Sequence, residues 1–595
     1  MLKKFFMNAL SSFVGAWIAL ALFGVMAVIV GIGIMAKLGA SSDTPSVSGH
    51  SILRLDLNGV IEEVQQPMNL SYADFMRGDI SRPQSLNVLV KGIEEGAENP
   101  DIEALYIECN GASAALATLD ALRNAVLKFK ESGKKVYAYG HSYTMGDYFV
   151  ASVADSLFLN NAGMIEMQGI TGTSIYMKDL FDKLGIRFQI AKVGTFKSAV
   201  EPVIMNEMSA PARAQLDTLY GNMWSYVRKS ISDSRKRLTP KGIDSLINVR
   251  NITFQPSKDM LACGLVDKLV YAREIPQILG DLIGRDPKKL NFVSPSDLVA
   301  QTNWGNAYNS KHQVAVLYAC GEIADGAGKG IDFLKLVPEI TRLADDDNVK
   351  GMVLRVNSPG GSVFGSDQIG EALDYFMSKG KPLAVSMGDY AASGGYWISC
   401  CSDRIFADPL TITGSIGIFG MFPDFKGTAE LIGVHPQTVS TNPSAAFPSI
   451  FQPMDTAQLA VLQQNVTRGY DRFVARVAKG RKLPESTVRR IAEGRVWDAQ
   501  TAVRLKLVDK LGSLQDAVDW VSAKAKLGSN YSVAVYPKLE PSIWDFIPSD
   551  AQLAVMAMLQ SNFPGQLDRR TFELACDILT RKPIQARMPE MTVTF

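Results

Sequence analysis

The chain contains one unit encoded twice, and this duplication limits the folds that its 595 residues can adopt. From position 140 onward the two copies align without a gap at an offset of 248 residues. The segments GLVDKL at 264–269 and LVDKLG at 507–512 extend the match. Length alone is compatible with about four domains, but a repeat of this size predicts two domains of one fold. Identical residues at equivalent positions include Gly140/Gly388, Gly146/Gly394, Tyr148/Tyr396, Asp155/Asp403, Phe158/Phe406, Gly172/Gly420 and Gly185/Gly433.

Each copy alternates short apolar runs with longer helical patterns. Such alternation predicts an α/β fold with largely parallel sheets that are buried on both faces. Sheets of this kind place their active sites at the carboxyl ends of the strands. In the second copy the apolar runs are 314–318, 352–356, 383–386 and 404–407, and helices are predicted over 366–378 and 391–401.

We divide the chain into five segments on this basis. The C-terminal one contains an apolar helix candidate at 551–559, which we expect to pack on the body because so short a helix cannot span a bilayer. The segments are an N-terminal anchor at 1–45, a first repeat at 46–285, a linker at 286–310, a second repeat at 311–540 and a C-terminal extension at 541–595.

The N-terminal segment predicts a membrane anchor. Residues 13–36 form 24 positions without a charge, and a membrane-spanning helix needs about 20. Lys3 and Lys4 precede this stretch, whereas only Lys37 directly follows it. By the positive-inside rule the N-terminus stays in the cytoplasm and the body faces the periplasm or the outside. We therefore expect a single-pass protein of the inner (cytoplasmic) membrane; the alternative is a long helix buried in the core.

The overall composition excludes several classes of function. The 61 basic and 60 acidic residues leave a formal charge of +1, which implies no general nucleic-acid-binding surface. The six cysteines include no C-x-x-C pair, and the four histidines include no H-E-x-x-H motif. These patterns argue against a zinc site, a disulfide scaffold or histidine-based metal catalysis. We expect no metal and no organic cofactor.

The turn after the predicted strand 383–386 carries a candidate nucleophile, Ser393, within the run Ala-Ala-Ser-Gly-Gly at 391–395. A serine among small residues between a strand and a helix is typical of a turn that presents a hydroxyl to a carbonyl group. Tight packing at a helix entrance is the alternative interpretation. The first copy has Met145 at the equivalent position, so it cannot supply the same nucleophile.

A second turn, Asn-Ser-Pro-Gly-Gly-Ser at 357–362, directly follows the predicted strand 352–356. Gly360 and Gly361 would let backbone N–H groups point at a ligand, although Pro-Gly is also a common turn pair. The double glycine is missing from the corresponding residues of the first copy, 110–114. The serine and the double glycine therefore occur together in one copy and are missing together in the other.

The third candidate is Lys197, in the first copy. Most lysines are solvated surface groups, but the equivalent position in the second copy is Ala445. The copy with the serine lacks the lysine, and the copy with the lysine lacks the serine. These complementary losses suggest one composite site built from both copies.

With these motifs the chain resembles the signal peptide peptidase A family of membrane-anchored serine proteases, in its long tandem-domain form. The resemblance covers nearly the whole chain, and the motifs together are much more specific than any one of them. They are the N-terminal anchor, VGTFKSAVEP at 193–202, NSPGGS at 357–362, SMGDYAASGGYWIS at 386–399, TGSIGIFG at 413–420 and GRVWDAQTA at 494–502.

The resemblance implies a fold related to the Clp protease and crotonase superfamily, with Ser393 as nucleophile, Lys197 as general base and Ser415 as a residue that orients the lysine. It also implies remnant signal peptides and other short extended peptides as substrates. The family's ring or bowl assemblies imply a homo-oligomer, with a tetramer favoured.

A serine–lysine mechanism requires an uncharged amine. The ordinary lysine pKa of about 10.4 must fall, and burial in apolar surroundings can lower it by several units. For the oxyanion we expect backbone N–H groups of Gly394 together with Gly360 or Gly361. Two alternatives stay open: a crotonase-like acyl-transfer or thioester enzyme, and a membrane-tethered scaffold whose peptidase activity has lapsed.

Overall fold

The computed structural model describes residues 47, 49–64, 83–326, 330–442 and 444–538, together with the backbone of 584–587 and 593–594. From Gly49 onward these residues belong to one compact unit. The expected anchor at 13–36 and the helix candidate at 551–559 lie outside the described residues. Within the described ranges, no helix is both long and apolar enough to cross a membrane.

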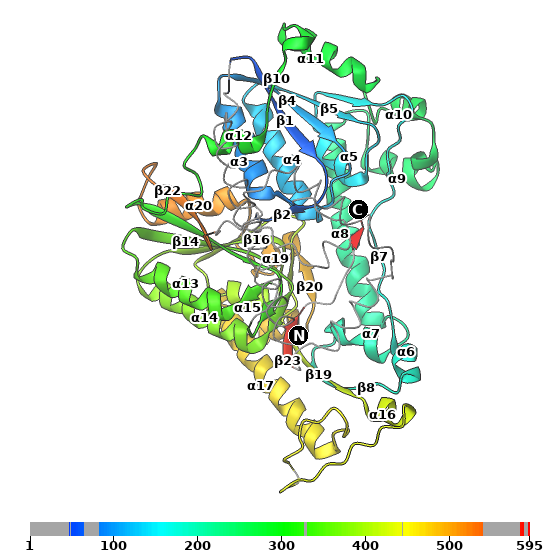
Figure 1. The fold of residues 1–595 in the computed structure, drawn as a ribbon, viewed down its shortest axis with the longest axis vertical. Coiled ribbons are helices and arrows are strands. Elements are labelled where there is room, and N and C mark those ends of the chain that lie inside the picture. Colours follow the sequence, from blue (N-terminus) through cyan, green and yellow to red (C-terminus); the bar gives the residue numbers. More distant parts are fainter. Residues whose placement is uncertain are drawn as a thin grey trace, which may run out of the picture. The chain divides into compact units, whose positions relative to one another are not determined.

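The first repeat is built on a six-stranded sheet in the order β10-β1-β4-β5-β6-β9, in which all neighbouring strands are parallel (Figure 1). Alternate residues face opposite sides of each strand. Ile52 and Tyr106 pack with the helix α11 (Ile275–Ile283) on one face, whereas Leu53 contacts the helix α3 (Leu86–Glu98) on the other. The strands are β1 (Ser51–Leu57), β4 (Ile102–Cys109), β5 (Lys135–Gly140), β6 (Ser156–Leu159), β9 (Lys268–Leu269) and β10 (Asn291–Val293).

The second repeat is built on an eight-stranded sheet, which confirms the predicted pair of parallel sheets. The helix α20 (Leu514–Lys524) covers one face, and the helices α13 (Phe333–Asp345), α14 (Val363–Ser378) and α15 (Gly394–Ser399) cover the other. Its main path is β20-β18-β16-β14-β11-β22, with β17 and β21 beside β16. The strands are β11 (Gln313–Cys320), β14 (Val349–Ser358), β16 (Leu383–Ala392), β17 (Arg404–Ala407), β18 (Ile412–Gly414), β20 (Val496–Asp498), β21 (Lys510–Leu511) and β22 (Ser532–Tyr536).

One predicted helix is shorter than expected. The sequence pattern predicted a helix over 391–401, but the chain stays extended to Ala392 and α15 begins at Gly394. Residues Tyr390, Ala391 and Ala392 pair with β18, and these backbone hydrogen bonds hold the segment in strand β16. The pairing brings the end of the strand directly to Ser393.

Equivalent hydrogen bonds confirm the duplication at the level of structure. The Tyr148 hydroxyl donates to the Leu265 carbonyl oxygen at 2.9 Å, and the Tyr396 hydroxyl donates to the Leu507 carbonyl oxygen at 2.9 Å. Arg235 pairs with Asp267 as Arg481 pairs with Asp509. The two copies thus share these polar contacts as well as the order of their central strands.

The stretch at 286–310, which we expected to be a linker, carries elements of its own. Strand β10 pairs with β1, and the helix α12 (Pro295–Ala300) packs against α3, where Gly92 leaves room for Pro295. Beyond these elements, Gly305 forms a bridge with Ala534 of the second sheet.

A third sheet joins the two repeats, in the order β13-β12-β15-β23-β19-β8. Strand β8 of the first repeat pairs antiparallel with β19 of the second through seven residue pairs. The C-terminal strand β23 lies between β15 and β19 and is antiparallel to both (Figure 1). The strands are β8 (Arg187–Val193), β12 (Ile323–Ala324), β13 (Ile331–Asp332), β15 (Gly360–Ser362), β19 (Ile418–Asp424) and β23 (Ile584–Arg587).

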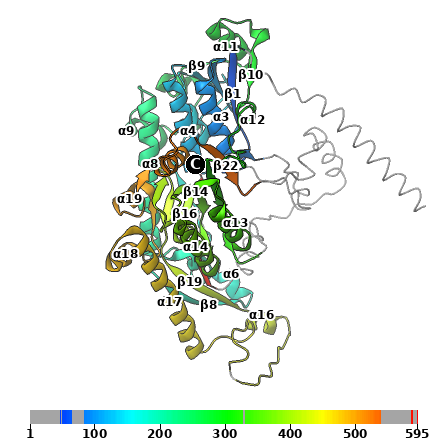
Figure 2. The same ribbon diagram turned by 90° about the vertical axis from the view of Figure 1, so that its left-hand side faces the viewer.

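Other elements surround these sheets, and Figure 2 shows α16 and α17 at the end of the described body remote from α11. The helices are α4 (Leu116–Glu131), α5 (Met145–Ala151), α6 (Lys178–Lys183), α7 (Glu201–Ile204), α8 (Ala210–Ser234), α9 (Pro240–Asn248), α10 (Ser257–Cys263), α16 (Lys426–Leu431), α17 (Thr456–Arg481), α18 (Glu485–Ile491) and α19 (Ala499–Arg504). The short strands are β2 (Ile61–Glu62), β3 (Gln84–Ser85), β7 (Thr171–Gly172) and β24 (Val593–Thr594).

Candidate active site

Ser393 occupies a sharp turn between β16 and α15. Its backbone has φ 55° and ψ −114°, a conformation that non-glycine residues rarely adopt and that costs free energy. The Ser393 N–H donates to the Gly414 carbonyl oxygen at 2.8 Å, and the Ser393 carbonyl oxygen accepts from the Trp397 N–H at 2.8 Å. Strand β18 and helix α15 therefore hold the turn in place, and Ser393 lies between a strand and a helix, where the sequence pattern placed it.

Lys197 follows strand β8 of the first repeat, and the second repeat holds its loop. The N–H of Phe196 donates to the carbonyl oxygen of Glu493 at 2.9 Å. The N–H and the hydroxyl of Thr195 donate to the carboxylate of the same glutamate at 3.0 and 2.8 Å. These contacts attach the lysine loop to Glu493, which precedes strand β20 of the second repeat.

The structure brings the predicted nucleophile and base together within one chain. The Nζ atom of Lys197 lies 2.8 Å from the Oγ atom of Ser393, and both residues are fully buried. Ser415, expected to orient the lysine, lies beside it, with its Oγ 3.1 Å and its carbonyl oxygen 3.2 Å from Nζ. The 2.8 Å distance is within the reach that a general base needs.

The environment of Lys197 favours the uncharged amine. Burial lowers the pKa of Lys197 well below its ordinary value, because the ammonium form loses its hydration. A neutral amine has one lone pair and two N–H groups. The lone pair can accept the Ser393 hydroxyl proton while the N–H groups donate to the two Ser415 oxygens. The geometry thus matches the form of lysine that can act as a base.

Two glycines make room for the lysine side chain. A Cβ atom at Gly494, where φ is +74°, would lie 2.6 Å from the Cβ atom of Lys197, and one at Gly417 would lie 3.3 Å from its Cδ atom. Gly417 lies in the motif at 413–420 and Gly494 in the motif at 494–502, but neither glycine was expected to have a role in the site. The contact depends on tertiary structure, so only the recurrence of glycine in the motifs could have signalled it.

The glycine turn at 357–362 packs against the start of α15. A Cβ atom at Gly395 would lie 2.7 Å from the carbonyl oxygen of Ser358. Gly360 and Gly361 have φ of 105° and 149°, and a Cβ atom at Gly361 would collide with the Ile323 backbone. Only glycine fits such positions without strain. The two motifs that the sequence analysis grouped therefore lie in contact.

The three glycines expected to bind an oxyanion differ in their present partners. The Gly360 N–H donates to the Ser358 hydroxyl at 3.2 Å. The Gly394 N–H stands in the first turn of α15, where N–H groups have no acceptor within the helix. Gly361 pairs with Ile323 on one side and with Ala586 of β23 on the other. Of the three, Gly394 is best placed to donate beside Ser393.

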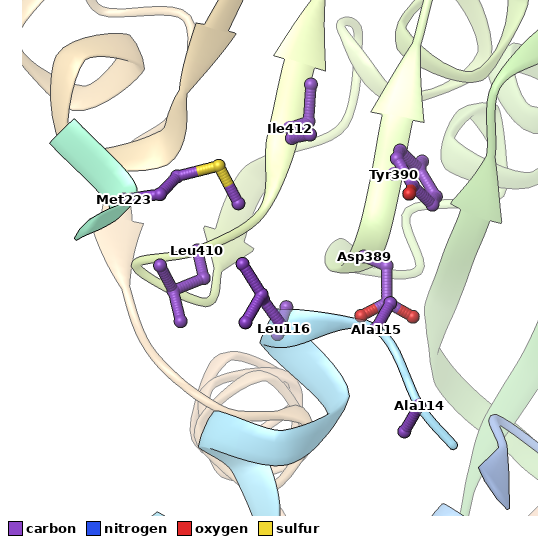
Figure 3. A pocket seen from close by; sticks show the side chains of 9 residues that line it. Ala114, Ala115, Leu116, Met223, Asp389, Tyr390, Leu410 and Ile412 are labelled. Atoms are coloured by element: carbon purple, nitrogen blue, oxygen red, sulfur yellow. The ribbon is translucent and has the colours of Figure 1, made fainter. Parts of the chain in front are cut away.

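Asp389, three residues before the end of β16, ties the nucleophile loop to the first repeat. Its carboxylate accepts from the Thr118 N–H and the Thr118 hydroxyl, each at 2.9 Å, and from the Asn357 side chain at 3.0 Å. Thr118 lies in the first turn of α4, whose own N-cap residue, Ala115, has no side-chain acceptor. Figure 3 shows the Asp389 carboxylate at this helix start, beside a cavity of about 30 Å³. No sequence motif pointed to this role of Asp389.

The equivalent region of the first repeat holds a different arrangement. Met145, at the position equivalent to Ser393, begins helix α5. The carboxylate of Asp147 accepts the N–H groups of Gly111 and Ala112, each at 3.1 Å. In the first repeat the Asp147 carboxylate therefore binds the backbone N–H groups of this turn, and position 145 carries a methionine without a hydroxyl group.

Comparisons with known proteins agree with the geometry. The model of peptidase family S49 matches residues 128–282 and 375–528, one segment in each repeat. Protease 4 of Haemophilus influenzae is 35% identical over 504 residues, which are 82% of this chain and 81% of that protein. Protease 4 of Salmonella typhi is 33% identical over 92% of this chain and 90% of its own length. A putative signal peptide peptidase of Enterococcus faecium is 31% identical over 45% of this chain and 80% of its own.

Proposed function

Because the chain belongs to peptidase family S49, as a serine protease of the long two-domain type, we propose that Ser393 and Lys197 form its catalytic dyad. We further propose that it is a membrane-anchored endopeptidase that cleaves short extended peptides. The observation that carries the dyad is the 2.8 Å distance between Lys197 Nζ and Ser393 Oγ in a fully buried setting.

The first chemical step transfers one proton and forms one bond. Neutral Lys197 accepts the hydroxyl proton of Ser393 while Oγ bonds to the peptide carbonyl carbon, and the carbonyl π electrons move to its oxygen. When the intermediate collapses, the C–N bond breaks and the leaving nitrogen takes the proton from Nζ. The product is an acyl-enzyme on Ser393. Lys197 then removes a proton from water, which releases the acyl group and restores the hydroxyl.

Stabilisation of the oxyanion is assigned to backbone donors. Gly394 N–H is the first of them, since it directly follows the nucleophile at the start of α15. The N–H group of Gly361 supplies the second donor once a substrate peptide replaces Ala586 of β23, its present partner on one side. Loss of one such donor typically costs about 3 kcal/mol of transition-state stabilisation.

The position of β23 supports an extended peptide as substrate. This strand of the chain's own C-terminal segment runs antiparallel along Gly360–Ser362 and along Phe419 and Gly420. Peptides that add a strand to a sheet gain affinity from main-chain hydrogen bonds, largely independent of sequence. A substrate peptide would take the same place between β15 and β19. The identity of the Enterococcus faecium relative as a putative signal peptide peptidase, together with the motif resemblance, favours remnant signal peptides as such substrates.

The cellular setting of the proposal comes from the sequence. The uncharged stretch 13–36, with Lys3 and Lys4 before it, supports a single span of the inner membrane with a cytoplasmic N-terminus and a periplasmic or external body. The family resemblance supports a homo-oligomer, with a tetramer favoured. Labelling of single cysteines placed on either side of 13–36, by a reagent that does not cross membranes, tests the topology: only the C-terminal one should react in intact cells.

Substitution of the dyad tests the proposed chemistry. Ser393→Ala and Lys197→Ala should each lower kcat/KM for a fluorogenic peptide by at least about 10³-fold while the far-UV circular dichroism stays unchanged. Turnover retained in either variant would reject the dyad. An acylating fluorophosphonate probe should label the wild-type chain and not Ser393→Ala; absence of labelling in the wild type would favour a lapsed scaffold. Binding of coenzyme A by the wild type would favour the acyl-transfer alternative.

A further inference from the structure

Three half-buried side chains form a cluster against the loop that carries Lys197. They are Phe196 of the first repeat and Arg495 and Trp497 of the second. The Cζ atom of Arg495 lies 4.8 Å from the centre of the Phe196 ring and 4.3 Å from the centre of the Trp497 ring. The guanidinium group therefore connects an aromatic ring of each repeat, through cation–π attraction and apolar packing of its stem.

The cluster adjoins the residues that surround the Lys197 side chain. Phe196 directly precedes Lys197, and Arg495 directly follows Gly494. A Cβ atom at Gly494 would lie 2.6 Å from the Cβ atom of Lys197. The Phe196 N–H also donates to the carbonyl oxygen of Glu493 at 2.9 Å. The loop of the first repeat and the turn of the second are thus joined by a backbone hydrogen bond and by the side chains of the cluster.

The backbone of Arg495 positions Ser415. The Ser415 N–H donates to the Arg495 carbonyl oxygen at 2.7 Å. The hydroxyl and carbonyl oxygens of Ser415 lie 3.1 and 3.2 Å from Lys197 Nζ. Since the φ of Ser415 is 52°, a value that non-glycine residues rarely adopt, its conformation depends on such contacts. A shift of the Arg495 backbone would move both oxygens that face the amine.

Trp497 connects the cluster to the strand beside the nucleophile. Its indole N–H donates to the Ile491 carbonyl oxygen at 3.0 Å, and its backbone pairs with Thr413 of β18. A Cβ atom at Gly414 would lie 2.9 Å from the Cδ1 atom of Trp497. The Gly414 carbonyl oxygen accepts from the Ser393 N–H. The ring that supports the guanidinium group is therefore held by the strand that holds Ser393.

The first repeat has different residues at the positions of Gly494, Arg495 and Trp497. The two LVDKL segments, at 265–269 and 507–511, align at an offset of 242 residues. At this offset the three equivalents are Ile252, Thr253 and Gln255. The glycine, the arginine and the tryptophan thus occur together in the copy that contacts Lys197 and are missing together in the other copy.

Exclusion of water determines the charge of Lys197. The side chain is fully buried, and burial lowers its pKa. In the described part of the chain, no carboxylate lies within ion-pair distance of Nζ, and the cations on the adjoining segments are Lys192 and Arg495. Water that reached Nζ would restore the hydration of the ammonium form. The carboxylates on these segments accept hydrogen bonds from other residues: Glu493 from Thr195, Glu201 from Ser209 and Asp389 from Thr118.

We propose that Arg495 is a positioning residue of the dyad, which holds the Lys197 loop against the turn before β20 and keeps water from the amine. The proposal rests on the proposed serine–lysine function and names the side chain that keeps its base uncharged. A planar guanidinium group stacks on aromatic rings, whereas a lysine ammonium is a compact and strongly hydrated charge. Among the described residues, no carboxylate pairs with Arg495, so the two rings are the partners of its side chain.

The pH dependence of peptide hydrolysis by the full-length chain in mild detergent tests this role. In Arg495→Ala, water gains access to Lys197, so the midpoint of the kcat/KM profile should rise by about one pH unit toward the ordinary lysine value. The rate on the high-pH plateau should change much less than the rate at pH 7, because the dyad itself is retained. A lower plateau with an unmoved midpoint would indicate a structural role alone and would overturn the proposal, as would an unchanged profile.

Further variants test the contact with Phe196. Phe196→Leu should raise the midpoint as Arg495→Ala does, and Arg495→Lys should raise it too, because an ammonium group does not replace the stacked plane. The double variant Arg495→Ala/Phe196→Leu should show no larger rise than Arg495→Ala, since both changes remove one contact. Additive rises, or a wild-type midpoint in Arg495→Lys, would contradict the proposed stacking.

Arg273→Ala is the matched control. The Arg273 guanidinium group lies 5.7 Å from the centre of the Tyr271 ring in the first repeat, so its loss also removes a cation–π contact and should leave the profile unchanged. Dyad variants separate this proposal from the proposed function. Turnover retained in Ser393→Ala would reject both. Inactive Ser393→Ala and Lys197→Ala variants, with a wild-type midpoint in Arg495→Ala, would retain the dyad and reject the role of Arg495.

Discussion

Asp389 and Thr118, which lie in different repeats, form the contact that joins the nucleophile loop to the first repeat. The Asp389 carboxylate accepts both the N–H and the hydroxyl of Thr118 at 2.9 Å. Through Asn357 the same carboxylate also reaches the glycine turn. Both loops that flank the reacting hydroxyl are thus held by one acidic side chain at the start of α4. The dyad needs such a tie, because its two members belong to different repeats.

Asp389→Ala should lower both stability and catalysis. Loss of a helix cap costs about 1 kcal/mol, and the released loop should lower kcat by more than tenfold with a smaller change in KM. Urea denaturation and peptide kinetics measure the two effects. Asp332→Ala is the matched control, because Asp332 caps a different helix, α13, by accepting the Leu334 N–H. The control should lose similar stability and keep its kcat; equal kcat in both variants would contradict a positioning role for Asp389.

The rate should depend on the ionisation of Lys197. Burial lowers the pKa of Lys197, and only the neutral amine accepts a proton, so kcat/KM should rise with pH through one ionisation and then reach a plateau well below pH 10.4. A pH profile with a peptide free of titrating groups measures it. Lys197→Arg should be inactive at every pH, since a guanidinium stays protonated. A rate that falls as pH rises would contradict the proposed base.

The same lysine should reduce the stability of the protein near neutral pH. Between the lowered pKa of Lys197 in the folded chain and about 10.4, the unfolded chain binds a proton at this residue that the folded chain does not, so the free energy of unfolding rises with pH over that range. Lys197→Met should therefore be more stable than the wild type at pH 7, and its advantage should shrink as the pH approaches 10.4. Denaturation at several pH values tests the sign. Lys192→Met, on the preceding strand β8, controls for the loss of a lysine.

The sequence predicted the dyad because each member could be compared with its own counterpart in the other copy. Ser393 against Met145 and Lys197 against Ala445 are differences visible without any structure. The central strands were likewise visible as apolar runs that a parallel sheet buries on both faces.

Contacts that depend on the packing of the two repeats were not predictable in this way. The cap from Asp389 to Thr118 spans 271 positions, and the hold of Glu493 on Thr195 spans 298. No local pattern specifies such partners. The start of the helix predicted over 391–401 was wrong for a related reason, since pairing with β18 keeps Ala391 and Ala392 in strand β16.

Gly494→Ala should remove activity by displacing the lysine. A Cβ atom there would lie 2.6 Å from Lys197 Cβ and 2.8 Å from its backbone nitrogen. A displacement of about 1 Å at a catalytic group can cost about 10²-fold in rate, so kcat should fall by about that factor. Gly380→Ala is the matched control, with φ of +75° against +74° and nothing within 4 Å of its Cβ position. Both variants place alanine at a similar positive φ, so only Gly494→Ala should show a lower kcat. Equal kcat values in the two variants would show that Gly494 is needed only for its backbone conformation and not to make room for Lys197.

Removal of β23 should strengthen the binding of peptide substrates. The strand pairs with Gly360–Ser362 and with β19, the two edges that a substrate peptide would use. A segment that competes within the same chain raises KM and leaves the chemistry of the bound substrate unchanged. Truncation after residue 583 should therefore lower KM for a short peptide with little change in kcat, and a tenfold fall would correspond to about 1.4 kcal/mol of competition. Truncation after residue 588 keeps β23 and removes β24, so it should retain the wild-type KM. Equal KM values in the two truncated chains would show that β23 does not compete with substrate.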